Sequence, residues 1–167
     1  MQNIEIKACC PDLAKAKAIA VHLGAQFGGE LHQIDTYFQV KSGRLKLREI
    51  NYQENQLIYY ERPDEAGARL SNYHIYPVSD PDLLKALLTS ALGILTVIEK
   101  RRVLYWLENV RIHLDRVKDM GDFIEFEGIV DDAHRTLEVM QKVASLQNSF
   151  QILSSNLVRT SYADLNL

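Results

Sequence analysis

Charged residues recur at a spacing of two within several otherwise apolar segments of this sequence. The groups are Glu5 with Lys7, Arg44 with Lys46 and Arg48, Lys100 with Arg102, His113 with Asp115, and Glu125 with Glu127. Side chains alternate between the two faces of a β-strand, so the members of each group point the same way and the apolar residues between them point the other way. One such group is usual on a solvated sheet, but this many predict a shared charged surface inside a barrel.

The basic residues on these faces outnumber the carboxylates. They are Lys7, Lys46, Arg48, Arg62, Arg69, Lys100 and Arg102, against Glu5, Asp115, Glu125 and Glu127. Enclosing an unpaired cation costs on the order of several kcal/mol unless a counter-charge enters. An enclosed excess of basic groups therefore predicts a ligand that carries several negative charges.

The carboxylates predict a metal ion. Glu5, Glu125 and Glu127 would repel one another at close range unless one is protonated or a divalent cation lies between them. Carboxylate oxygens favour Mg²⁺ or Mn²⁺. Sites that catalyse phosphoryl transfer typically combine basic groups that bind phosphates with carboxylates that bind a metal ion. His113 fits a hydrogen-bonding role in this site as well as it fits a metal ligand.

The hydrophobic periodicity predicts the elements that position these side chains. Strands are predicted over residues 2–9, 31–40, 43–50, 56–62, 69–76, 95–107, 109–117 and 122–130. Helices are predicted to begin near Pro11 and end at Leu23, to run from the N-cap Asp80 to Leu92, and to run from Asp131 to about Leu146, with a short helix in the tail from Ser155 to Leu167. Short links between strands indicate an antiparallel sheet. We expect an α+β fold in which a closed eight-stranded antiparallel barrel has its apolar face outward, beneath flanking helices, and its charged face inward.

The whole chain of 167 residues is predicted to form a single domain, because no repeat or Pro/Gly/Ser-rich linker divides it. A net charge of −3 gives no reason to expect nucleic-acid binding. No apolar run is long enough to cross a membrane, and Glu5 and Lys7 interrupt the early apolar stretch that a signal peptide would need. We expect a cytoplasmic protein, and the sequence is compatible with a homodimer.

Several segments resemble the CYTH superfamily, also called the triphosphate tunnel metalloenzymes. They are NIEIK (3–7), DTYF (35–38), GRLKLRE (43–49), IYYERPD (58–64), EKRR (99–102), VRIHLDRVKDMGDFIEFEG (110–128) and SYADL (161–165). They cover nearly the whole chain in the order that the family uses. The segments YYERPD (59–64) and HLDRV…GDFIEFEG (113–128) look most similar to the branch of class IV adenylyl cyclases; the superfamily also includes thiamine triphosphatases and inorganic triphosphatases.

The resemblance implies a role for each inward charge. Glu5, Glu125 and Glu127 would bind Mg²⁺ or Mn²⁺, and the triphosphate would be held by Lys7, Lys46, Arg48, Arg62, Arg69, Lys100 and Arg102. Glu5, Lys7 and Asp115 would take part in catalysis, with Asp115 supporting the metal or a water. The substrate would be a small triphosphate such as ATP, tripolyphosphate or thiamine triphosphate.

Asn3 departs from the family pattern, which has a glutamate at this position of its ExExK signature. An asparagine offers a carbonyl oxygen to a cation but brings no negative charge, so a metal position is expected to be weakened. Position 3 could also lie at a frayed chain end, outside the site. Three functions therefore stay open: cyclisation of ATP to cyclic AMP and pyrophosphate, hydrolysis of a triphosphate, and binding of a polyphosphate or nucleotide without turnover.

Overall fold

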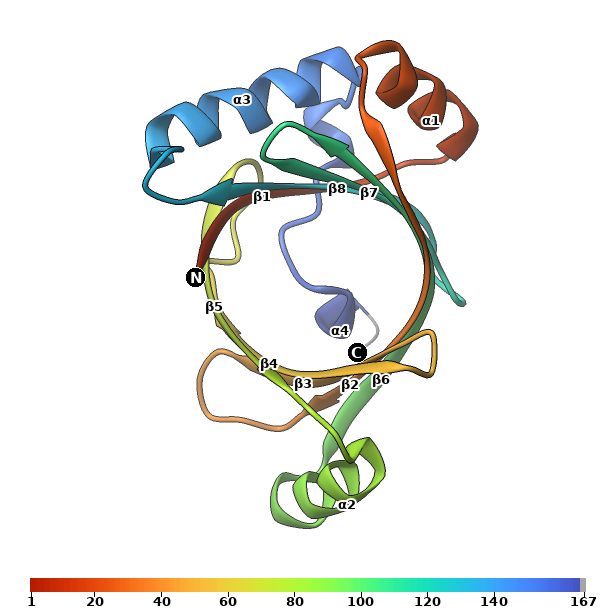
Figure 1. The fold of residues 1–167 in the computed structure, drawn as a ribbon, viewed down its shortest axis with the longest axis vertical. Helices are drawn as coiled ribbons and strands as arrows, with labels where there is room; N and C mark the ends of the chain where they lie inside the picture. Colours follow the sequence, from red (N-terminus) through yellow and green to blue (C-terminus); the bar gives the residue numbers. More distant parts are fainter. Residues whose placement is uncertain (166–167) are drawn as a thin grey trace.

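The computed structural model describes residues 1–165, in which the strands form a closed antiparallel barrel (Figure 1). The order around the barrel is β1, β5, β4, β3, β2, β6, β7, β8. The bounds are β1 (Gln2–Cys9), β2 (Gln26–Phe38), β3 (Arg44–Ile50), β4 (Glu54–Glu61), β5 (Arg69–Pro77), β6 (Ile94–Leu107), β7 (Val110–Val117) and β8 (Gly121–Val130). This confirms the predicted fold class. Because the barrel is closed, its sheet has no unpaired edge strand.

The second strand begins earlier than residue 31, where it was predicted to begin. Gln26 already pairs with Trp106 of β6, and an irregularity lies between Phe27 and Gly29. The two glycines in this stretch conceal the strand, because glycine weakens the alternating pattern. Gly28 is required by packing, since a Cβ there would lie 2.9 Å from the side chain of Leu104.

Helices α1 (Leu13–His22), α2 (Pro81–Leu92) and α3 (Thr136–Ser149) flank the barrel. The first two begin as the sequence predicts, because Asp12 and Asp80 accept hydrogen bonds from backbone N–H groups of the first turn. The prediction that α3 begins at Asp131 was wrong. The carboxylate of Asp131 instead accepts from the backbone N–H groups of Ala133 and His134, which closes a separate turn before the helix.

The C-terminal segment was predicted as one short helix from Ser155, and the structure differs. A 3₁₀ turn at Ser154–Asn156 is followed by extended chain and then by α4 (Tyr162–Leu165). The extended part lies against β1, where the N–H of Val158 donates to the carbonyl of Lys7 at 2.8 Å. Within Figure 1, α4 appears inside the outline of the barrel. Leu167, the last residue of the predicted helix, lies outside the described residues.

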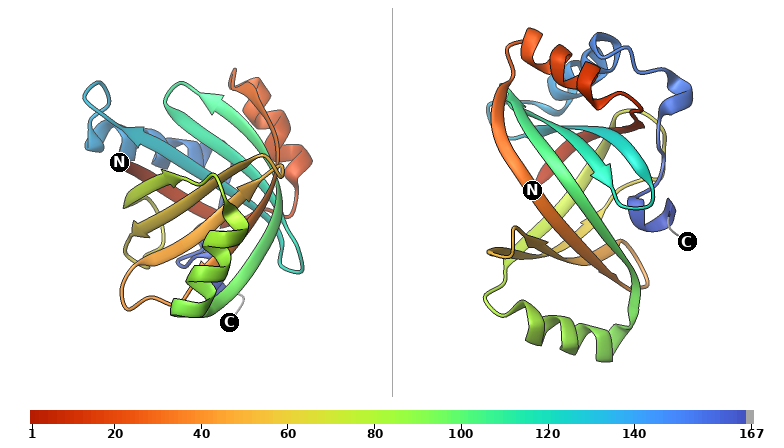
Figure 2. Two further views of the ribbon diagram at one scale, coloured as in Figure 1. Left: turned by 60° about the horizontal axis from the view of Figure 1, so that its bottom comes forward. Right: turned by 90° about the vertical axis from the view of Figure 1, so that its right-hand side faces the viewer.

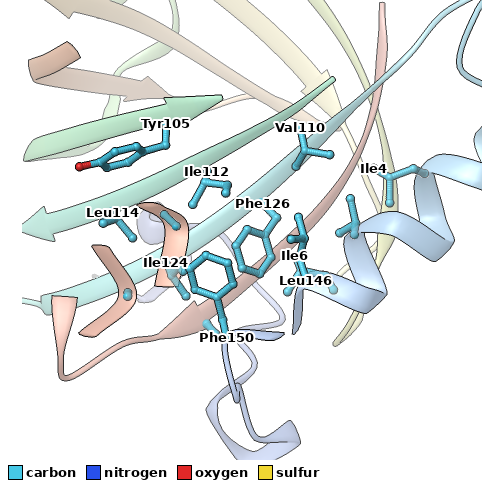
Figure 3. Packing of buried hydrophobic residues seen from close by; sticks show 14 of the residues in the cluster. Ile4, Ile6, Tyr105, Val110, Ile112, Leu114, Ile124, Phe126, Leu146 and Phe150 are labelled. Atoms are coloured by element: carbon cyan, nitrogen blue, oxygen red, sulfur yellow. The ribbon is translucent and has the colours of Figure 1, made fainter. Parts of the chain in front are cut away.

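The main hydrophobic core lies outside the barrel, between its wall and helices α1 and α3 (Figure 3). Ile6 of β1, Ile112 of β7 and Phe126 of β8 point outward into this core, and Phe126 meets Phe150 edge to face with ring centroids 5.0 Å apart. Gly128 allows α3 to approach closely, because a Cβ there would lie 2.4 Å from the side chain of Val139. The predicted arrangement, apolar outward and charged inward, is confirmed on this side.

Helix α2 lies on the opposite side of the barrel from α1 and α3 (Figure 2). It contacts β2 and β3, where Lys85 forms an ion pair with Glu49 at 2.6 Å. Within residues 1–165, none of the helices is long and apolar enough to cross a membrane.

Candidate functional site

The barrel contains a cavity of about 110 Å³ lined mainly by charged and polar side chains. Its lining comprises Asn3, Glu5, Lys7, Tyr37, Lys46, Arg48, Ile58, Tyr60, Arg62, Ser71, Tyr73, Ile75, Lys100, Arg111, Glu125, Glu127 and Tyr162. Most of the predicted site residues therefore meet in one space. They come from strands far apart in sequence, because closure of the barrel brings β1 between β5 and β8.

One wall of the cavity is cationic and is organised around Asp35 of β2. This carboxylate is fully buried and accepts two hydrogen bonds from Arg48, at 2.7 and 2.8 Å. Lys46 Nζ lies 3.1 Å from the same group and Lys100 Nζ lies 3.5 Å from it. Three cations thus share one carboxylate, and we call Asp35, Lys46, Arg48 and Lys100 the Asp35 cluster.

The pKa values in the Asp35 cluster reflect one carboxylate that is shared by three cations. Burial alone would raise the pKa of Asp35, but Arg48, Lys46 and Lys100 outweigh it and hold that pKa well below its usual value. Burial and the neighbouring Arg48 lower the pKa of Lys46 to about 7, and burial and Arg102 lower the pKa of Lys100 to about 8. The two lysines would be more stably charged if a further anion entered the cavity.

The facing wall is rich in carboxylates and is carried by β7 and β8. His113, Glu125 and Glu127 each offer one ligand atom within 4.8 Å of the other two. Lys7 Nζ lies 3.4 Å from Glu125, and Arg111 lies 3.0 Å from Glu127. We call His113, Glu125 and Glu127 the Glu125 cluster.

Protonation in the Glu125 cluster suits metal binding. Burial would raise the pKa of Glu125, but Lys7, His113 and Arg102 hold it well below its usual value. Arg111 and His113 similarly outweigh burial at Glu127 and lower its pKa. Burial and Arg102 lower the pKa of His113, which favours the neutral imidazole. Ionised carboxylates and a neutral imidazole are the forms that bind metal ions.

The donor set fits Mg²⁺ or Mn²⁺, because two carboxylates with one imidazole are mostly hard ligands. A further oxygen faces the same cavity. Asn3 is 5% exposed, and its buried Oδ1 has no hydrogen-bond partner among residues 1–165. A buried carbonyl oxygen without a partner is costly, and a cation would satisfy it. Position 3 is therefore part of the cavity rather than a frayed end.

Sequence comparison places this geometry in a known family. The CYTH domain profile matches residues 1–162. The chain belongs to the CYTH domain family. A Methanocaldococcus jannaschii protein named "Putative adenylate cyclase" is 24% identical over 174 residues, covering 99% of this chain and 98% of the relative.

Solved structures agree with this CYTH fold. A Pyrococcus horikoshii protein is 26% identical, with 98% of each chain covered and a TM-score of 0.86. A Hippeastrum protein described as having a dominant triphosphatase activity is 15% identical, with 98% of this chain and 93% of that chain covered and a TM-score of 0.63. At that identity the second likeness concerns the fold alone.

Three of the predicted site residues lie outside the lining of the CYTH cavity. Arg102 donates two hydrogen bonds of 2.6 Å to Asp115 and one of 2.8 Å to Glu125. Asp115 is fully buried, and Arg102 lowers its pKa to about 2 against the effect of burial. Arg69 donates to the backbone carbonyls of Val158 and Arg159 at 3.1 and 2.7 Å. These side chains position the cavity wall and the C-terminal segment.

Glu5 also has a different setting from the one expected. It was grouped with Glu125 and Glu127 as a metal ligand, but its Oε1 accepts hydrogen bonds from Arg62 and Arg69, the latter at 3.3 Å. Glu5 pairs in register with Glu127 of β8, and His113 is the residue whose ligand atom groups with those of Glu125 and Glu127. Glu5 still lines the CYTH cavity, where it holds Arg62 in place.

Sequence reasoning missed three residues that shape this cavity: Asp35, Arg111 and Tyr162. Two of them carried a usable signal. Asp35 is two residues from Tyr37, in a stretch already quoted for its resemblance, and it pairs in register with Arg48. Arg111 shares its strand face with His113 and Asp115. Tyr162 lies in the tail, whose path the strand pattern does not determine.

Proposed function

We propose that this protein is a metal-dependent enzyme that hydrolyses a triphosphate compound inside its barrel. The observation that carries the proposal is the distribution of charge around one cavity inside the barrel. The three cations of the Asp35 cluster face the Glu125 cluster, whose ligand atoms lie within 4.8 Å of one another. An anion bound at the Asp35 cluster and a cation bound at the Glu125 cluster would balance the charge of both.

The phosphate oxygens would be bound by Lys46, Arg48 and Lys100, with Lys7 and Arg62 as further cations of the cavity lining. Arg48 presents a planar guanidinium fixed by Asp35, and such fixed donors stabilise developing negative charge without reorganising. The divalent ion would be held by His113, Glu125 and Glu127, with Asn3 as a further oxygen ligand. When bound, it would neutralise charge on the phosphate oxygens.

The remaining predicted residues would act by positioning. Asp115 fixes Arg102, which in turn orients Glu125. Glu5 holds Arg62 at the cavity, and Arg69 ties the strand to the C-terminal segment. Lys7 reaches both Glu125 and the cavity, so it is the group we assign to the charge that develops during bond cleavage.

Hydrolysis is favoured because it needs only the triphosphate, the metal and a water. The activity described for the Hippeastrum neighbour is consistent with this reaction. Cyclisation of ATP is the second candidate, and the name of the Methanocaldococcus jannaschii relative, which matches along the whole chain, supports it. In that reaction the ribose hydroxyl replaces water as the nucleophile, and pyrophosphate leaves.

The test is incubation of the protein with ATP, tripolyphosphate or thiamine triphosphate, each with Mg²⁺ or Mn²⁺, followed by identification of the products. Orthophosphate supports hydrolysis, and cyclic AMP with pyrophosphate supports cyclisation. Metal-dependent binding without any product would identify a binding module. The Arg48→Ala variant controls for a contaminating phosphatase, because it should lose the activity while Arg116→Ala, at an exposed ion pair, should keep it.

A further inference from the structure

Tyr162 belongs to α4, which lies toward one end of the barrel (Figure 2). Its side chain lines the cavity although the residue belongs to the C-terminal segment rather than to the barrel. The phenol ring is 2% exposed and packs edge to face on Phe123, with ring centroids 5.0 Å apart. A large aromatic surface therefore faces the charged groups of the barrel.

Two cavity lysines lie over this ring. Lys7 Nζ is 3.7 Å from the ring centroid and Lys100 Nζ is 4.9 Å from it. Both distances fall within the range in which an ammonium group is attracted to the face of an aromatic ring. Lys7 comes from β1 and Lys100 from β6, so a single side chain brings together cations from two separate strands.

The carboxylate partners of these lysines are more distant than those of the arginines. Lys7 lies 3.4 Å from Glu125 and Lys100 lies 3.5 Å from Asp35, whereas a charge-assisted hydrogen bond is usually about 2.7–2.9 Å long. An aromatic face stabilises an ammonium group without accepting a directed hydrogen bond. The N–H groups of both lysines are thus left able to turn toward phosphate oxygens.

Other contacts fix the position of the ring. The hydroxyl of Tyr162 donates to Asp115 at 2.9 Å, and burial raises the pKa of this phenol well above its usual value, so the hydroxyl keeps its proton. Asp164 accepts a hydrogen bond of 2.6 Å from Ser161 and forms an ion pair of 2.9 Å with Arg44 of β3. The short helix is held from both sides, which keeps the ring under the lysines.

We propose that Tyr162 is a positioning residue whose aromatic face holds Lys7 and Lys100 in the cavity, charged and ready to bind phosphate oxygens. This inference rests on the proposed function, because it assigns the lysines to the triphosphate. It goes further in naming the aromatic ring, rather than the phenol hydroxyl, as the part that matters for binding.

The experiment measures the affinity for tripolyphosphate by calorimetry in the presence of EDTA, so that no metal contributes. Tyr162→Leu removes the ring and should weaken binding about tenfold, the size expected when two partly desolvated cation–π contacts are lost. Tyr162→Phe keeps the ring and should stay within about threefold of the unmodified protein. Phe150→Leu is the matched control, since it removes an aromatic ring that packs edge to face on Phe126 in the core outside the barrel, also with centroids 5.0 Å apart, and it should stay within about threefold.

Two results would overturn the inference while leaving the proposed function intact: unchanged affinity in Tyr162→Leu, or an equal loss in Tyr162→Phe. If the unmodified protein does not bind tripolyphosphate in EDTA, the same variants are compared with Mg²⁺ present, and failure of the unmodified protein to bind there as well would reject the proposed function and the inference with it. If Tyr162→Leu does not fold, phenylalanines of increasing ring fluorination at position 162 give the same test at nearly constant shape. Affinity should fall step by step with fluorination, and a flat series would overturn the inference.

Discussion

The two walls of the cavity differ in how their buried charges are paired. In the Asp35 cluster a single carboxylate is shared by three cations, and the lowered pKa values of Lys46 and Lys100 reflect the surplus of positive charge. In the Glu125 cluster two carboxylates lie together, and their cationic neighbours are Lys7, Arg111 and Arg102, the last of which also binds Asp115. One wall lacks an anion and the other has room for a cation.

This difference shows that the net charge of a site says less about its ligand than the positions of the individual charges do. Counting all inward groups gives a modest excess of basic residues, which fits any anion. Considering the two walls separately predicts a more specific ligand. An anion bound together with a metal ion would balance the charge of both walls at once. The strands also explain the separation, since Glu125 and Glu127 lie on β8, whereas Lys46 and Arg48 lie on β3 and Lys100 lies on β6.

The largest expected effect comes from Asp35→Asn, which removes the only carboxylate of the Asp35 cluster. Three buried cations would then face one another, and breaking such a group typically costs about 3–5 kcal/mol of stability. Urea unfolding measures the loss. Glu125→Gln is the comparison on the other wall, and it should cost less because Arg102 keeps its pair with Asp115.

Tripolyphosphate should restore much of the stability lost in Asp35→Asn, since it returns negative charge to the cationic wall. Equal destabilisation by the two substitutions, with no recovery on adding the anion, would contradict the distinction between the walls.

Arg48→Ala should have the next largest effect, now on binding rather than on folding. Its guanidinium lines the cavity and is oriented by two hydrogen bonds to Asp35. Loss of charge-assisted hydrogen bonds to phosphate should weaken tripolyphosphate binding by about 1.5–3 kcal/mol. Arg116→Ala serves as the control, because Arg116 is exposed and pairs with Asp122 outside the barrel. Similar affinities for both variants would place Arg48 outside the ligand site.

A smaller effect is expected from pH. The pKa values of Lys46 and Lys100 are lowered to about 7 and about 8, so both lysines lose their charge in the free protein as pH rises through that range. Metal-free affinity for tripolyphosphate should therefore fall between roughly pH 7 and pH 9. Calorimetry at a series of pH values checks this. Lys46→Arg stays charged and should remove the earlier part of the decline.

Stability should respond to pH in the opposite direction. Between the lowered pKa of Lys46 and its ordinary value of 10.5, the unfolded chain binds more protons than the folded one. The contribution of this lysine to the free energy of unfolding should therefore rise with pH over that range. The difference in stability between the unmodified protein and Lys46→Met isolates this contribution, and a difference that falls with pH would contradict the assigned shift.

The barrel was predictable because its signal is local. Alternation in segments such as 43–50 and 122–130 fixes which side chains point inward, and the barrel then brings them together whatever the loop geometry. The grouping within the cavity was not predictable in the same way. Pairing of Arg102 with Asp115 depends on the register between β6 and β7, and pairing of Glu5 with Arg62 depends on the loop after β4; the pattern of one strand contains neither. The path that brings Tyr162 into the barrel depends on contacts of the tail with β1 and β3.

The smallest effect is expected at Asn3 of β1, which stands where the ExExK pattern that the N-terminal segment resembles has a glutamate. Asn3 lies opposite Ser71 of β5 and Ile129 of β8, and its Oδ1 has no partner among the described residues. Asn3→Glu would add negative charge on the face that carries Glu5, close to Glu127 on the neighbouring strand. The added charge attracts a divalent ion and repels its neighbours when the ion is absent.

Without metal, Asn3→Glu should therefore melt at a lower temperature than the unmodified protein, and Mg²⁺ or Mn²⁺ should raise its melting temperature by more. Thermal unfolding in EDTA and in a metal series measures both, and any triphosphatase or cyclase activity should increase at limiting metal. Asn3→Gln is the matched control, because it lengthens the side chain without adding charge. If Asn3→Glu and Asn3→Gln show the same metal dependence, negative charge at position 3 does not reach the ion. The polarity of the cavity would then be set by the Glu125 cluster alone, and the missing glutamate of the signature would have no bearing on metal binding.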